Sequence, residues 1–381
     1  MYDLTACDTS FADRDQQLAE LREHNPVAWD DENGWWLITR HADITSVSRD
    51  TETFSSKHGV TYFSPTQLSM ITMDPPDHTR LRRLVSKQFT PRMVKLWRGL
   101  AARKANQGID RLLAAGGGDF VEEVAVPTTL AVIMHMLGIG EERRADIRNW
   151  SDDMMAAGGR SHIPGVTEKG IAAGKAWTSH LAGHIEDKLA NPTDDLLSLV
   201  AADSEDPLTG EDLRQFALLL IVAGNETTRH SSSFGVELFA QYPDQAAAIR
   251  ANADLMPTAI PEVLRWTSII RAMSRTATKT VELGGVTIKE GQLLNLIYPS
   301  ANRDEAVFED PFTFDIRRDP NPHLAFGIGT HYCLGANLAQ LQLNVILGAW
   351  LQRVPAYQVV GVEHFHTGMV TGLKHLMIEV G

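Results

Sequence analysis

Cysteine is nearly absent from this chain of 381 residues, which contains only Cys7 and Cys333. Two cysteines can form at most one bridge, which excludes the disulfide framework of small secreted proteins. The longest apolar run, 216–224, is far shorter than the roughly 20 residues that cross a bilayer. Residues 1–17 are acidic and lack the basic and apolar regions of a signal peptide. We therefore expect a soluble cytoplasmic protein with no membrane anchor.

Basic residues are also in short supply, with 35 lysines and arginines against 48 acidic residues and a net charge of −13. This balance argues against a nucleic acid or an anionic membrane surface as partner. Repeats, low-complexity tracts and long Ser/Gly linkers are missing as well. Because 43% of the residues are hydrophobic, the chain can bury a large core. We expect a single domain over residues 1–381.

Apolar residues recur with the 3.6-residue period of helices along most of the chain. The expected helical segments are 11–25, 80–112, 124–137, 141–157, 169–189 and 195–202. Strands are expected at 26–40, as a hairpin around Asn33-Gly34, and at 280–298 and 357–380. The breaks at 57–76, 157–166 and 299–330 are interpreted as long functional loops. The pattern predicts a mainly α fold with small sheets.

The longest expected helix runs from Thr209, a suitable N-cap, to Tyr242 before Pro243. Its middle reads "AGNETTRHSSS", which is unusually polar and small for a helix long enough to cross the whole molecule. One interpretation is that a surface face emerges here, with hydroxyls bonding to backbone carbonyls. The other is a groove in which a large group rests, where Thr227 bonds one turn back and opens a path for protons beside Glu226.

Cys333 lies in "AFGIGTHYCLG", just before a helical pattern. Backbone N–H groups at the start of that helix would lower the pKa of the thiol, and the glycines allow close approach of the backbone. Four interpretations remain open from the residues alone. The thiol could be inert and buried, a nucleophile with His331 as base, part of a zinc site, or the axial thiolate of a haem iron.

Five segments, in order, resemble the cytochrome P450 family. They are "MDPPDHTRLRRLVSKQFTP" (73–91), "AGNETT" (223–228), "EVLR" (262–265), "DPFTFDIRR" (310–318) and "FGIGTHYCLG" (326–335). The last is similar to the family's haem-ligand loop, and the others to its early haem-flanking helix, acid–alcohol motif, E-x-x-R motif and meander. The resemblance covers almost the whole chain and implies the P450 fold, a helix-rich triangular prism with small β-sheets.

The resemblance implies a haem b cofactor with Cys333 as its axial thiolate, beside Gly335 and shielded from water by Phe326. Ala223 and Gly224 would leave room for the haem, and Glu226 and Thr227 would relay protons. A buried charge network would anchor the ligand loop, and the haem propionates would need cationic partners. The expected network residues are Glu262, Arg265 and Arg318; the expected propionate partners are His78, Arg82, Arg275, His323 and His331.

The implied activity is hydroxylation of an unactivated C–H bond in a lipophilic molecule, using O₂ and two electrons from a ferredoxin and its reductase. "NETTRH" (225–230) and "HLAFGIGTH" (323–331) resemble the steroid- and lipid-hydroxylating bacterial branch. A steroid- or terpenoid-like substrate is therefore favoured, with fatty acids and macrolide or polyketide intermediates as alternatives. Several apolar residues are expected to line the substrate pocket; the alternative is that they simply belong to the hydrophobic core. They are Tyr62, Phe63, Leu219, Ile269, Ile270, Met369 and Val370.

Electrons would have to come from separate partners, because no flavin or iron–sulfur domain is recognisable. Basic residues on or beyond the early haem-flanking helix could face an acidic ferredoxin or could simply be solvated. They are Arg92, Lys95, Arg98, Arg103 and Lys104. A monomer is expected. A haem sensor or carrier without turnover stays open as a second function, although the intact Glu226–Thr227 pair favours the enzyme.

Overall fold

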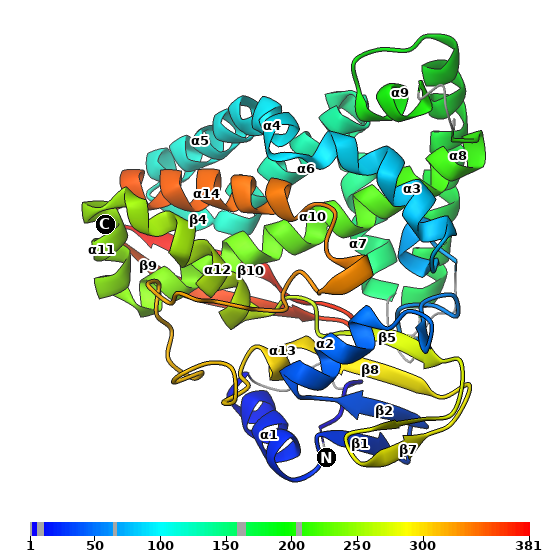
Figure 1. Ribbon diagram of the computed structural model, residues 1–381. Coiled ribbons are helices and arrows are strands. Elements are labelled where there is room, and N and C mark those ends of the chain that lie inside the picture. Colours follow the sequence, from blue (N-terminus) through cyan, green and yellow to red (C-terminus); the bar gives the residue numbers. More distant parts are fainter. Residues whose placement is uncertain (1, 6–10, 64–66, 158–164, 203–207) are drawn as a thin grey trace.

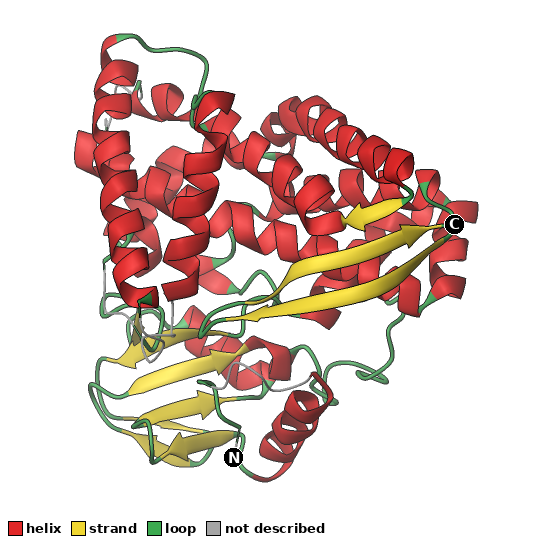
Figure 2. Cartoon of the chain, turned by 180° about the vertical axis from the view of Figure 1, so that it is seen from behind, coloured by secondary structure: helices red, strands yellow, loops and turns green. Residues whose placement is uncertain are grey.

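The computed structural model describes residues 2–5, 11–63, 67–157, 165–202 and 208–381 (Figure 1). Cys7 and most of the expected loop 157–166 lie outside these residues. Helices form the larger part of the molecule, and the strands gather at one corner and along the back (Figure 2). The predicted mainly α architecture with small sheets is confirmed.

The central helix is α10, Gly210–Gln241, which contacts α6 (Val126–Met136), α7 (Arg144–Ala157), α8 (Val166–Ala190) and α14 (Ala336–Arg353). Thr209 caps its start, because its hydroxyl accepts the Asp212 N–H while the Asp212 carboxylate accepts the Thr209 N–H. The helix ends at Tyr242, since Pro243 begins the next helix. The predicted bounds are therefore confirmed.

The expected helix over 80–112 is wrong in one respect, because it is broken into α3 (Asp77–Ser86), α4 (Pro91–Val94) and α5 (Arg98–Ala115). Short 3-10 turns join the pieces. The break has a local cause: Thr90, before Pro91, is extended with ψ 155, as the residue before a proline prefers. Thr90 then caps the next helix through the Met93 N–H.

The remaining helices are all shorter than α10. They are α1 (Phe11–His24), α2 (His41–Arg49), α9 (Leu196–Ala201), α11 (Pro243–Ala251), α12 (Met256–Thr267) and α13 (Tyr298–Ala301). Within the described residues, no helix is long and apolar enough to cross a membrane.

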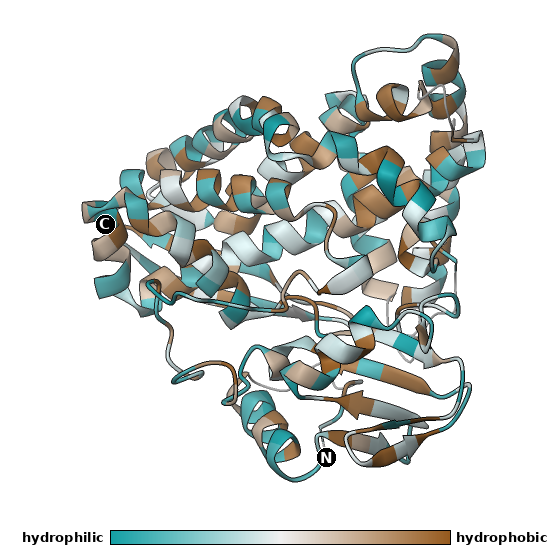
Figure 3. Cartoon of the chain, viewed as in Figure 1, coloured by the Kyte–Doolittle hydropathy of each residue, from teal (hydrophilic) through white to brown (hydrophobic). Residues whose placement is uncertain are grey.

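The main sheet has the strand order β1 (Val27–Asp30), β2 (Trp35–Ile38), β8 (Leu293–Ile297), β5 (Ala272–Ala277), β3 (Phe54–Ser55). The expected hairpin joins β1 to β2, and Gly34 takes φ +74 in its turn. Strands β2 and β8 pair in parallel, while the other neighbours are antiparallel. Figure 3 shows the apolar residues of β2 and β8 in the middle of this sheet.

The second sheet places β10 (Thr371–Val380) between β4 (Gly117–Asp119) and β9 (Tyr357–His366). The expected C-terminal hairpin is β9–β10, and β10 also contacts α10. The strands β6 (Val281–Leu283) and β7 (Val286–Ile288) form a separate small hairpin.

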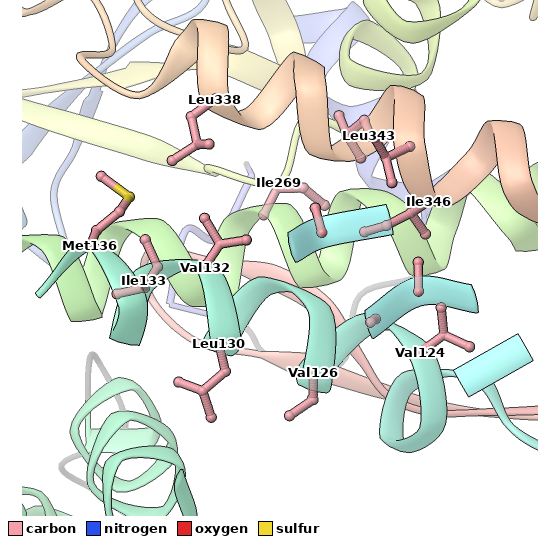
Figure 4. Close-up of a cluster of buried hydrophobic side chains, with 14 of the residues drawn as sticks. Val124, Val126, Leu130, Val132, Ile133, Met136, Ile269, Leu338, Leu343 and Ile346 are labelled. Carbon is pink, nitrogen blue, oxygen red and sulfur yellow. The ribbon is translucent and has the colours of Figure 1, made fainter. Parts of the chain in front are cut away.

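The main hydrophobic core lies among the central helices, and a second core backs the main sheet. Figure 4 shows part of the main core, where Ile133 of α6 and Leu338 of α14 contribute buried side chains together with Ile269, which follows α12. These helices hold α10 and the loop before α14 in fixed relative positions.

Candidate active site

The segment that carries Cys333 is a tight loop that leads into α14. Gly327 and Gly329 adopt φ +66 and +75, a region that side chains disfavour. The Cys333 N–H donates to the Phe326 carbonyl at 2.9 Å, and the Gly335 N–H donates to the sulfur. At Gly329 a Cβ atom would lie 2.7 Å from the carbonyl oxygen of Ser48 at the end of α2. The glycines therefore let the loop fold back on itself and pack against α2.

Burial raises the pKa of the Cys333 thiol, while the Gly335 N–H and the nearby Arg82 lower it. The expected lowering by the helix start is thus outweighed by the effect of burial. A thiolate here needs a further positive partner, such as a metal ion. Among the described residues, the one group of three side chains spaced for a metal is Asp119, Glu122 and His375. Cys333 is not part of it, which removes the zinc interpretation for this part of the chain.

Four of the five expected propionate partners form a basic group beside Cys333, in which His78 and Arg275 are buried and Arg82 and His331 half-buried. His78 on α3 is 2% exposed, and its ring centroid lies 4.4 Å from that of His331. Arg82 follows one turn after His78, and Arg275 reaches the group from β5. Burial, with Arg275, His78 and Arg82 nearby, lowers the pKa of His331 to about 2. The pKa values of His78, Arg82 and Arg275 are also lowered, mainly by burial.

Some polar atoms of this basic group have no hydrogen-bond partner among the described residues. Both ring nitrogens of His78 and the Nε of Arg275 are buried without a hydrogen bond among the described residues. Buried polar atoms are almost always satisfied in folded proteins. Two carboxylates placed here would supply the missing acceptors and neutralise the repulsion between cations. The residues present therefore fit a haem that has its propionates here and Cys333 on its iron.

His323 is the exception, because the structure does not bring it to this group. Its pKa is lowered to about 4 by burial and by Arg265, with Glu262 acting in the opposite sense. Its Nδ1 accepts the Ala325 N–H at 3.2 Å, and its ring packs near Phe326. The chain before the ligand loop thus carries His323 to the charge network, and the expectation of a propionate partner is corrected.

The expected charge network is built around Glu262 and Arg265, both 0% exposed on α12. Their side chains make two parallel hydrogen bonds of 2.7 Å, and Arg318 Nε lies 3.2 Å from Glu262 Oε2. Arg265 also donates to the carbonyls of Asn302 and Pro311 at 2.8 Å. A missed member is Asn321, whose Nδ2 donates to Glu262 Oε2 at 3.0 Å. The network ties α12 to residues 302–321, which lead to the ligand loop.

The middle of α10 turns two different faces to its surroundings. Ala223 is exposed and Thr227 half-buried, although both lie halfway along the central helix. The Thr227 hydroxyl donates to the Ala223 carbonyl at 2.8 Å, as the sequence predicts. At Gly224 a Cβ atom would lie 2.7 Å from Ile133 Cδ1, so glycine permits close packing of α10 against α6.

Glu226 is 0% exposed and is held in an ion network away from the Thr227 hydroxyl. Arg229 donates to its Oε2, and His230 Nε2 lies 3.2 Å from the same oxygen. Arg229 also donates to Asp152 of α7 at 2.9 Å. Against the effect of burial, Arg229 and His230 hold the pKa of Glu226 at about 2. The pKa of Asp152 is raised to about 6, mainly by burial and also by the charge of Glu226, although Arg229 acts in the opposite direction.

Sequence reasoning missed Arg229, His230 and Asp152. The first two were within reach, because they follow Glu226 by three and four residues and so share its helix face. Asp152 was not, since it lies on another helix and only the fold brings it to Arg229.

The expected pocket residues largely come together where the segment after α12 meets the β9–β10 turn. Ile270 forms a bridge with Val370, and Arg271 N donates to the Met369 carbonyl at 2.8 Å. Tyr62 and Phe63 pack against Gly368, where a Cβ would lie 2.2 Å from the Tyr62 hydroxyl.

Two of these residues belong to the core instead. Val370 is 0% and Ile269 5% exposed, so their side chains do not line a space that water can enter. Leu219 is half-buried on α10 at the edge of the main core.

Comparisons with known proteins show the family to which the chain belongs. Residues 179–356 match the family model described as cytochrome P450. The chain is 37% identical over 389 residues to a steroid C26-monooxygenase of Mycolicibacterium smegmatis, which covers 96% of this chain and 90% of the relative. The structure of Mycobacterium marinum cytochrome P450 CYP268A2 in complex with pseudoionone is 33% identical, with a TM-score of 0.90, covering 97% of this chain and 95% of that one. Bacillus megaterium CYP109E1 in complex with testosterone is 31% identical, also with a TM-score of 0.90, covering 96% and 97%.

These similarities define the class as haem proteins in which a cysteine ligates the iron. The chain belongs to the cytochrome P450 family and is a P450 monooxygenase. The predicted family, fold, cofactor and enzyme class are confirmed.

Proposed function

We propose that this monooxygenase uses Cys333 as the axial ligand of its haem and hydroxylates a steroid-like substrate. The observation that carries the haem site is the basic group of His78, Arg82, Arg275 and His331 beside Cys333, with buried donors that lack acceptors. When bound, the haem supplies the iron at which O₂ is activated, and the overall reaction turns a C–H bond, O₂, two electrons and two protons into an alcohol and water.

Different residues of the protein would bind the haem and transfer protons. His78, Arg82, Arg275 and His331 would hold the two propionates, and the Gly335 N–H would stabilise charge on the Cys333 sulfur. The Thr227 hydroxyl, on the exposed side of α10, holds a proton at Oγ1 and passes it toward the reaction. The carboxylate of Glu226, buried one residue earlier, would relay protons by accepting a proton and passing it on.

A steroid-like substrate is supported by the similar proteins and by the residues expected to line the substrate pocket. The relative from Mycolicibacterium smegmatis is a steroid C26-monooxygenase, and CYP109E1 was solved with testosterone. Tyr62, Phe63, Ile270 and Met369 offer partly exposed apolar surface in one region.

A titration with a panel of sterols, steroids, fatty acids and a macrolide precursor tests this substrate class. Steroids are expected to shift the haem spectrum from low to high spin and to yield hydroxylated products. Tight binding and turnover of fatty acids or the macrolide precursor alone would overturn the steroid proposal.

We also infer that a ferredoxin docks on the face behind Cys333. Arg92, Lys95, Arg98 and Arg103 are exposed there, and Leu96 between them is 70% exposed. Asn337 at the start of α14 donates to the Phe89 carbonyl, which places this surface next to the ligand loop. Lys104 is a weaker candidate, since it pairs with Glu141 at 2.7 Å.

We further propose that the 381 residues form one monomeric, cytoplasmic haem domain.

A haem carrier or sensor is the alternative, and Thr227 argues against it. A carrier has no use for a hydroxyl on the exposed side of the central helix with a charged acid one residue before it. Oxidation of NADPH without any product, across all substrates and redox partners tried, would favour the carrier.

A further inference from the structure

His230 lies at the crossing of α10 and β10 and is 0% exposed. Its Nδ1 accepts the N–H of Leu373 at 3.2 Å. In a neutral imidazole the other nitrogen then carries the proton. Burial lowers the pKa of His230, which keeps the ring neutral. The nitrogen that carries the proton, Nε2, lies 3.2 Å from Glu226 Oε2.

The strand is shaped to accept this ring. At Gly372, which precedes Leu373 on β10, a Cβ atom would lie 2.4 Å from three atoms of the imidazole. Real Cβ atoms do not approach other atoms so closely, so any larger residue would push the ring away. Glycine at 372 thus lets β10 pass directly over His230.

The Glu226 carboxylate is consequently contacted by two different side chains, Arg229 and His230. Arg229 also binds Asp152, which is 37% exposed, so it links Glu226 to the surface end of the network. His230 is anchored to β10, which is part of the second sheet. Removing His230 would leave Oε2 to Arg229 alone and free the carboxylate to follow that side chain toward Asp152.

We propose that His230 is a positioning residue that orients the Glu226 carboxylate for proton delivery, through the close contact of its Nε2 with Glu226 Oε2, while its Nδ1 is fixed to strand β10. The inference rests on the proposed role of Glu226. It adds that His230, which is fixed to β10, holds the Glu226 carboxylate in place together with Arg229. His230 touches neither substrate nor haem in this scheme, and acts through Glu226.

The partition of oxygen reports this role. Productive turnover converts a substrate C–H bond, O₂, two electrons and two protons into an alcohol and water. Unproductive turnover leaves the substrate unchanged and converts O₂, two electrons and two protons into H₂O₂. The electrons come from the ferredoxin in both cases. The ratio of product to H₂O₂ therefore reports where protons are delivered and does not depend on how much enzyme is folded.

The test compares His230→Asn with His230→Gln in the haem-loaded enzyme with saturating ferredoxin. Asparagine can keep the contact near Leu373 but does not reach Glu226, whereas the glutamine amide can donate from near the Nε2 position. We expect the product-to-H₂O₂ ratio to fall about tenfold in His230→Asn, in the range seen when an orienting hydrogen-bond partner is removed, and to stay within about threefold of wild type in His230→Gln. Equal ratios in both variants and wild type would overturn the proposal.

A second pair of variants avoids changing the histidine. Gly372→Ala should displace the ring and lower the same ratio, while Gly361→Ala on β9, where a Cβ would meet Met377 at an ordinary 3.5 Å, should not. Glu226→Gln separates the two levels of the account. If Glu226→Gln lowers the ratio but His230→Asn and Gly372→Ala do not, only the role of His230 fails; if Glu226→Gln leaves it unchanged, the proposed role of Glu226 fails first.

Discussion

Glu226 and Thr227 are neighbours in the chain but lie in different surroundings. The threonine hydroxyl bonds back to Ala223 on the exposed side of α10, while the glutamate is enclosed by Arg229, His230 and, through Arg229, Asp152. The two residues can therefore be tested separately, because each depends on different contacts.

Thr227→Ala should uncouple turnover, because it removes the hydroxyl proton on this side of the helix. We expect product formed per NADPH to fall about tenfold or more, in line with general acid–base contributions, while NADPH oxidation continues as H₂O₂ forms. Ser231→Ala is the matched control, since Ser231 makes the same kind of bond to the Thr227 carbonyl at 2.8 Å one turn later. Equal coupling in both variants and wild type would contradict the role of Thr227.

Asp152 gives a prediction about pH and stability. Its pKa rises from the usual 3.8 to about 6 on folding, so the folded protein binds a proton more tightly there than the unfolded chain does. The stability that this provides is present below about pH 4 and is lost as the pH rises through about 6. Urea unfolding of wild type and Asp152→Asn should thus show wild type losing stability relative to the variant between pH 4 and 7. If the difference in unfolding free energy between wild type and Asp152→Asn stays constant or changes in the opposite sense between pH 4 and 7, the raised pKa of Asp152 is contradicted.

At the scale of elements, α12 and residues 302–321 behave as one unit. Glu262 accepts hydrogen bonds from Arg265, Asn321 and the Asp315 N–H, and Arg318 lies against the same carboxylate. The meander has little regular structure of its own, so this buried carboxylate organises it.

Glu262→Gln should destabilise the folded protein by about 3–5 kcal/mol, the usual cost of breaking a buried ion pair from one side. Denaturant unfolding of the haem-loaded protein measures this. Glu211→Gln removes an exposed carboxylate with the same three-residue spacing to its arginine, Arg214, and should cost under about 1 kcal/mol. Similar losses in the two variants would show that the Glu262 network does not stabilise the fold.

Helix α10 and the β1–β2 hairpin were predictable because a capping residue, a proline or an Asn-Gly turn marks their ends. The break at Pro91 was also marked in the sequence, but apolar periodicity runs across it and masked the signal. His323 shows a different limit. The resemblance identified it as part of the site, yet whether it faces the haem or a neighbouring element depends on packing between segments distant in sequence.

At the scale of the whole molecule, charge is unevenly spread. The chain carries −13 overall, yet Arg92, Lys95, Arg98 and Arg103 are exposed together behind the ligand loop. A local positive surface on an acidic protein would steer an acidic partner to one face and repel it from the rest.

Electron transfer from ferredoxin should therefore weaken as salt rises, because charges separated by more than about 8–10 Å are screened near physiological ionic strength. Arg92→Glu should raise the KM for ferredoxin about tenfold at low salt, and the difference should shrink at high salt. Lys289→Glu makes the same charge change at an exposed site outside the group and should leave KM unchanged. If both variants respond alike, only net charge matters and the docking face is wrong.

The central claim is that Cys333 ligates the iron of a haem monooxygenase. The most direct test is the absorption spectrum of the reduced protein with carbon monoxide bound, recorded for wild type and Cys333→Ser. The account predicts the long-wavelength Soret band typical of thiolate ligation in wild type and its loss in Cys333→Ser. An imidazole-type band in intact wild-type protein, or a thiolate band that persists in Cys333→Ser, would contradict it.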